Sequence, residues 1–85
     1  MDYIVDAAKM KERKAAHEYL KDQFHFPDYY GANLDALHDC IGELTGANIY
    51  FLHTEQESYA DKVYRVLSDC DGEGITLIDV GLIEE

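Results

Sequence analysis

Three acidic residues, Asp35, Asp39 and Glu43, are spaced four residues apart in one stretch of the chain. At 100° per residue, this spacing places them on one face of a helix. Each like-charged pair costs an isolated helix about 0.2–0.5 kcal/mol, and the stretch has no Lys or Arg to offset that cost. The face is therefore either a solvated acidic surface or a surface that binds cations. The apolar residues of the stretch are on the opposite face: Leu34, Leu37, Cys40, Ile41 and Leu44.

Two adjacent aromatic residues, Tyr29 and Tyr30, precede this helix in a loop that begins near Pro27 and contains Gly31. Paired loop aromatics can form a flap over the core. Alternatively, at least one of them can anchor an interface, because tyrosine offers a large contact area with few torsions to fix. Aromatic rings beside carboxylates suit the side chains of Arg and Lys.

The sequence does not fit the common catalytic templates. His38 and Cys40 are two apart on a helix and point in different directions. Asp35 and Asp39 lack any sign of burial that would separate them into an acid and a base. We find no phosphate-binding glycine loop and no metal-ligand cluster, so we predict no cofactor and no metal site. The remaining histidines are interpreted as packing or hydrogen-bonding residues: His17, His25 and His53.

Strand and helix patterns alternate along the chain. Asn33 is a predicted cap for the second helix, and Thr54 and Glu57 have the spacing of a capping box for the third. The nearly continuous apolar run in Asn48–His53 predicts a strand that is buried on both faces. The chain is thus predicted to be a single α/β domain, 1–85, with helices packed on a three-stranded parallel sheet. The strands are Tyr3–Asp6, Asn48–His53 and Ile75–Val80, and the helices are Lys11–Phe24, Leu34–Leu44 and Tyr59–Cys70.

The charge balance points to a cationic partner. The 85 residues include seven Lys or Arg and eighteen Asp or Glu, for a net charge of −11, and no Lys or Arg occurs from Asp22 to Asp61. Such a surface repels nucleic acid and attracts a basic protein. No apolar run approaches the ~18 residues of a membrane span, and the start lacks a secretory signal. We therefore expect a cytoplasmic protein with reduced cysteines, Cys40 and Cys70, in its core.

The segment FPDYYGANLDALHD, Phe26–Asp39, resembles the signature of the barstar family, intracellular inhibitors of a secreted ribonuclease. The resemblance implies a barstar-like fold and a loop and helix that plug the ribonuclease active site. Asp39 would take the place of a substrate phosphate, with Asp35 beside it, and Tyr29 would pack on the catalytic histidine of the enzyme. These roles are implied by the family, whose type pair is a reference case for electrostatic steering and for a dominant interface aspartate.

Further roles follow from the same resemblance. Asp69 matches an acid that reaches a basic side chain at the rim of the enzyme cleft, although its spacing from Arg65 also allows a local ion pair. His38 stands where the family has tryptophan, and Glu43 or Leu44 stands where a second tryptophan occurs. Gly31 and Asn33 would supply loop contacts. The candidate partner-binding residues are Tyr29, Tyr30, Gly31, Asn33, Asp35, His38, Asp39, Glu43 and Asp69.

The leading hypothesis is that the chain is monomeric when free and occludes the active site of a small, basic, secreted, barnase-like ribonuclease. It has no catalytic residues, nucleic-acid partner or membrane partner in this hypothesis. An alternative is an interaction module of the same fold that binds a different basic protein or toxin. A third is a small hydrolase that uses Asp35 and Asp39.

Overall fold

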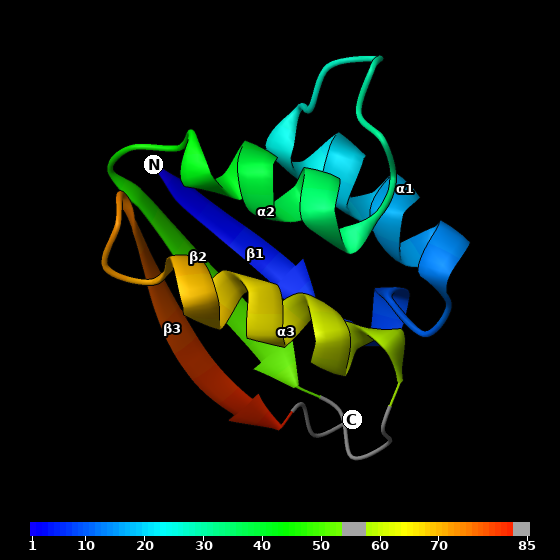
Figure 1. Cartoon of the computed structure of the whole chain (residues 1–85). Helices are drawn as coiled ribbons and strands as arrows, with labels where there is room; N and C mark the ends of the chain where they lie inside the picture. The colour runs from blue at the N-terminus through cyan, green and yellow to red at the C-terminus, as the bar shows by residue number, and fades with distance from the viewer. Residues whose placement is uncertain (54–57, 83–85) are drawn as a thin grey trace.

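The computed structural model describes residues 1–53 and 58–82. The three strands pair in parallel in the order β1-β2-β3, and the three helices and a short 3-10 helix, η1, all lie between strands along the chain (Figure 1). This confirms the predicted α/β class with a three-stranded parallel sheet. None of the described helices is long and apolar enough to span a membrane. The elements are β1 (Asp2–Asp6), η1 (Ala7–Lys9), α1 (Arg13–Phe24), α2 (Leu34–Gly42), β2 (Ala47–His53), α3 (Tyr59–Cys70) and β3 (Ile75–Leu82).

The helices cover only one face of the sheet. Val5 and Ile49 on the covered face are fully buried, whereas Ile4 and Val80 on the other face are 57% and 53% exposed. The strand order explains this, because each crossover moves to the next strand in the same direction, and right-handed crossovers then place every helix on the same side. The prediction that Asn48–His53 is buried on both faces was wrong: β2 alternates between buried and half-buried residues.

The covered face and the inner sides of the helices form one core. Leu37 and Ile41 of α2 and Val63 and Leu67 of α3 are all fully buried. Burying such a side chain contributes roughly 1.5–3 kcal/mol. Packing against the core therefore fixes which side of α2 faces solvent. Cys70 also lies in this core, Cys40 is only half-buried, and both thiols are free.

The start of α2 is capped as predicted. The Oδ1 atom of Asn33 accepts a hydrogen bond from the backbone N–H of Ala36 at 2.7 Å. The helix ends at Gly42, two residues before the predicted Leu44, and Glu43 is its C-cap with near-helical φ and ψ of −85° and −12°.

Other boundaries differ slightly from the expected ones. Helix α1 begins at Arg13 rather than Lys11, and β3 continues to Leu82, beyond the predicted Val80. Ser58 caps α3 and forms a capping box with Asp61. The capping box predicted from Thr54 and Glu57 lies outside the described residues.

A glycine allows the turn before β3 to approach the chain segment that follows α2. Gly74 has φ of +111°, and a Cβ atom there would collide with the carbonyl oxygen of Leu44. Only glycine combines this backbone conformation with the close approach.

Candidate protein-binding surface

The exposed side of α2 carries the predicted acidic residues. Asp35, His38, Asp39 and Glu43 are all exposed, as the helical spacing predicted. Within residues 1–53 and 58–82, no Lys or Arg side chain lies within 4.0 Å of any of the three carboxylates. The surface defined by these four residues, called the acidic face below, is therefore not neutralised by ion pairs within the described chain.

The two loop tyrosines have different environments. Tyr29 is 83% exposed. Tyr30 is half-buried, its ring centroid lies 4.8 Å from that of Phe26, and its hydroxyl is 2.7 Å from Nδ1 of His17. Tyr30 thus attaches the loop to the core, whereas Tyr29 projects into solvent next to the acidic face.

His17 connects three parts of the fold. It lies in α1, is 2% exposed, and its Nε2 atom is 2.7 Å from the hydroxyl of Tyr59 at the start of α3. Burial, and secondly the charge of Arg13, lower the pKa of His17, and burial raises the pKa of both Tyr30 and Tyr59. In the neutral imidazole one nitrogen donates and the other accepts, so each tyrosine hydroxyl takes the complementary role. The predicted hydrogen-bonding role of His17 is confirmed.

The other histidines differ from one another. The ring of His53 packs between Phe51 and Tyr64, with centroid distances of 4.7 and 4.9 Å, which confirms the predicted packing role. Its Nε2 atom also lies 3.0 Å from Oδ1 of Asp79 on the next strand. His25 is exposed and ends α1 with φ of +56°, so the prediction that its side chain packs or bonds locally was wrong. A residue in this left-handed conformation terminates the helix through its backbone, which leaves the side chain free of the core.

The loop enters α2 through a defined backbone path. The side-chain amide of Asn33 donates to the carbonyl oxygen of Gly31 at 3.3 Å, and Ala32 has φ of +52°. A Cβ atom at Gly31 would lie 3.3 Å from Cβ of Ala36, which is a tight contact. These features hold the loop close to the first turn of the helix.

A hollow of about 440 Å³ between the loop and α2 brings together five of the predicted residues. Asp39 and Glu43 line it from the helix side. The loop side includes Tyr29, Tyr30 and Gly31.

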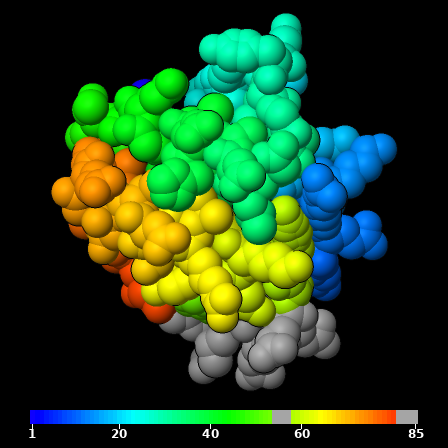
Figure 2. Space-filling view, in the orientation of Figure 1, coloured from blue at the N-terminus to red at the C-terminus, as the bar shows by residue number. Residues whose placement is uncertain are grey.

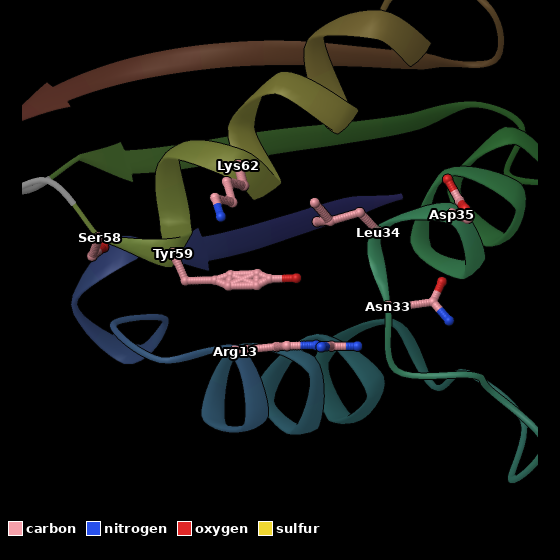
Figure 3. A pocket seen from close by; sticks show the side chains of 7 residues that line it. All are labelled: Arg13, Asn33, Leu34, Asp35, Ser58, Tyr59 and Lys62. Carbon is pink, nitrogen blue, oxygen red and sulfur yellow. The ribbon is translucent and has the colours of Figure 1, made fainter.

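A second, open pocket of about 620 Å³ contains Asn33 and Asp35. It lies between α1 and the first turns of α2 and α3 (Figure 3). Asp35 and Asp39 therefore line different hollows. Sequence reasoning missed the other polar residues of this pocket, because Arg13, Tyr59 and Lys62 form no recognisable motif.

Helix α3 continues the surface beyond α2. The Sγ atom of Cys70 contacts the carbonyl oxygen of His38 at 3.9 Å, so the end of α3 lies beside the middle of α2. The two helices form one face of the molecule, with the tyrosine loop at its edge (Figure 2). Asp69 is exposed on α3, and the described residues show no ion pair between it and Arg65.

Comparison with known proteins agrees with this arrangement. The family model described as Barstar (barnase inhibitor) matches residues 2–75. A Bacillus subtilis (strain 168) protein named "Putative ribonuclease inhibitor YrdF" is 39% identical over 77 residues, which cover 82% of this chain and 85% of that protein. The chain therefore belongs to the barstar family.

Proposed function

We propose that this chain is a stoichiometric inhibitor of a small basic ribonuclease, not an enzyme, and that it covers the active site with the acidic face and Tyr29. Family membership and the name of the Bacillus relative support an inhibitory role. The observation that carries the mechanism is the row of exposed carboxylates on α2 without ion-pair partners in the described chain.

The acidic face can imitate the substrate of such an enzyme. Carboxylate oxygens on a rigid helix can accept the hydrogen bonds that Arg and Lys side chains otherwise give to RNA phosphates. Charge-assisted hydrogen bonds are about twice as strong as neutral ones. Asp39 would occupy a phosphate position, with Asp35 and Glu43 one turn away on either side. Asp69 and His38 would contact the rim of the cleft.

The loop is held in place before the partner arrives. Tyr30 is bonded to buried His17, and Asn33 caps α2 and also bonds Gly31. Binding then requires little further ordering of the loop, and pre-organisation of this kind increases affinity. An interface of roughly 800 Å² on each partner would suffice. In the cytoplasm, a free monomer of this kind would protect the producing cell from its own secreted nuclease.

The test is a titration of RNA cleavage by barnase with the purified chain. We expect cleavage to stop near an equal molar ratio. Asp39→Ala should weaken binding by about 3 kcal/mol or more, because it leaves desolvated cations of the enzyme without a counter-charge. Glu18→Ala, which removes an exposed acid from α1, is the matched control and should inhibit as well as the wild type. Equal inhibition by Asp39→Ala would show that the assigned role of Asp39 is wrong.

A second candidate is a module that binds a different basic protein, such as a toxin without ribonuclease activity. The exposed His38, at a position where the family has an aromatic residue, favours this alternative. A pulldown from the producing cell at low salt distinguishes the two. Recovery of a basic partner with ribonuclease activity supports the first, and recovery of one without it supports the second.

A further inference from the structure

The second pocket contains two cationic side chains in a strongly acidic protein. Arg13 approaches from α1 and Lys62 from α3, and the ring of Tyr59 lies between them (Figure 3). The Nζ atom of Lys62 is 5.8 Å from the centroid of that ring. We call Arg13, Tyr59 and Lys62 the basic pocket.

Neither cation forms an ion pair inside the described chain. Across residues 1–53 and 58–82, no carboxylate lies within 4.0 Å of Arg13 or Lys62. The first residues of α2 and α3, Leu34 and Tyr59, also line the pocket, so the positive ends of two helix dipoles are close to it. The Tyr59 side chain is held in place because its hydroxyl is hydrogen-bonded to buried His17.

The pocket also has one acidic border, which restricts what can fill it. Asp35 of the acidic face lines the same pocket from the opposite side. A lone small anion would bind Arg13 and Lys62 but would be repelled by Asp35. A protein surface with a cation beside an anion would satisfy both sides at once.

We propose that the basic pocket receives an Asp or Glu side chain of the inhibited ribonuclease while Asp35 pairs with a neighbouring Arg or Lys of the same enzyme. This inference rests on the proposed function and specifies which basic ribonucleases the chain would bind. A ribonuclease with an acid beside its basic cleft is accepted, and one with a cation at that position is rejected by Arg13 and Lys62.

The proposal predicts the opposite sign from simple charge attraction. Removing positive charge from an acidic inhibitor should strengthen its attraction to a basic enzyme. If a carboxylate of the enzyme occupies the basic pocket, removing the charges of Arg13 and Lys62 should instead weaken binding. The two effects can therefore be told apart by direction alone.

The experiment compares two double variants with the same change in net charge. The pocket variant, Arg13→Gln with Lys62→Gln, removes both positive charges of the basic pocket. Lys9→Gln with Lys14→Gln removes two exposed cations that do not line it. Association and dissociation rates are measured against a basic ribonuclease that the wild-type chain inhibits, beginning with barnase. Urea unfolding shows whether each variant remains folded.

We expect the pocket variant to raise Kd about five- to tenfold, mainly through faster dissociation. The control variant should leave Kd unchanged or lower it. If the pocket variant binds as tightly as the control, the inference is wrong, although inhibition by the wild type would still support the proposed function. Failure of the wild type to inhibit any basic ribonuclease would instead contradict the proposed function.

A second arm identifies the source of the carboxylate. Each Asp and Glu around the enzyme cleft is replaced in turn by Asn or Gln. One of these enzyme replacements should weaken binding to the wild-type chain but should not weaken binding to the pocket variant any further. Additive losses at every position would overturn the proposal. The proposal would also be overturned if inorganic phosphate bound the free chain at Arg13 and competed with the enzyme.

Discussion

At the scale of single residues, adjacent side chains of the same type have different tasks. Tyr29 is exposed, whereas Tyr30 packs on Phe26 and bonds His17. We predict that Tyr29→Ala weakens inhibition and changes the free energy of unfolding by less than about 0.5 kcal/mol. Tyr30→Ala should reduce that free energy by roughly 2–4 kcal/mol, because it removes buried ring contacts and a hydrogen bond. Urea unfolding and inhibition titrations check both, and equal effects on stability would contradict the assignment.

His17 predicts a specific pH dependence of stability. Burial and the charge of Arg13 lower its pKa in the folded state from the ordinary 6.5. The unfolded state therefore binds the proton more readily, so this contribution to stability is complete above about pH 6.5 and is lost as the pH falls further. We expect the free energy of unfolding to fall less between pH 7.5 and about pH 5.5 in His17→Gln than in the wild type. His25→Gln, at an exposed histidine, should follow the wild type, and equal slopes for all three would contradict the prediction.

At the scale of elements, the cap of α2 joins stability to the site. Asn33→Ala removes the hydrogen bond to the N–H of Ala36 and should lower the free energy of unfolding by about 1 kcal/mol. Asn33→Asp retains the acceptor for Ala36 and adds a charge that suits a helix N-terminus, but it loses the hydrogen bond that the Asn33 amide donates to Gly31, so it should be destabilised less than Asn33→Ala. Urea unfolding measures both variants. Equal destabilisation would show that the cap itself is not the cause.

The sequence predicts those features of the fold that depend on residue spacing and residue type within one element. The spacing of apolar residues identified the buried side of α2, and the residue type at position 33 identified its cap. The burial of β2 depends on strand order, which the apolar run Ile49–Leu52 cannot show. At the end of α2, the backbone N–H groups of Glu43 and Leu44 donate to the carbonyl oxygens of Cys40 and Ile41, three residues back, and a tightened last turn of this kind defines the helix end only to within one or two residues.

The candidate site likewise combines features that follow from local helical geometry with contacts between distant elements that the sequence does not predict. The exposure of Asp35, Asp39 and Glu43 follows from helical geometry, and their role in binding remains a prediction. The bond between His17 and Tyr30 joins residues thirteen apart in the sequence. Arg13 and Lys62 line one pocket only because α1 and α3 pack side by side. Sequence periodicity contains no information about such contacts between elements.

At the scale of the whole molecule, the net charge of −11 would steer the encounter with the proposed basic ribonuclease. The Debye length falls from about 10 Å at 0.1 M salt to about 3 Å at 1 M. We therefore predict that the association rate with an inhibited ribonuclease falls about tenfold or more over this range, while the dissociation rate changes much less. Stopped-flow mixing measures both rates. An association rate independent of salt would mean that the acidic surface does not guide the encounter.

The one-sided covering of the sheet separates the molecule into two surfaces. Ile4 and Val80 lie on the bare face of the sheet, and the acidic face points away from it on the other side of the helices. A fluorophore, biotin or solid support attached at Thr76, an exposed residue on the bare face, would leave α2 unobstructed. The fold thus provides a natural handle for building an immobilised sensor that captures its enzyme in a uniform orientation.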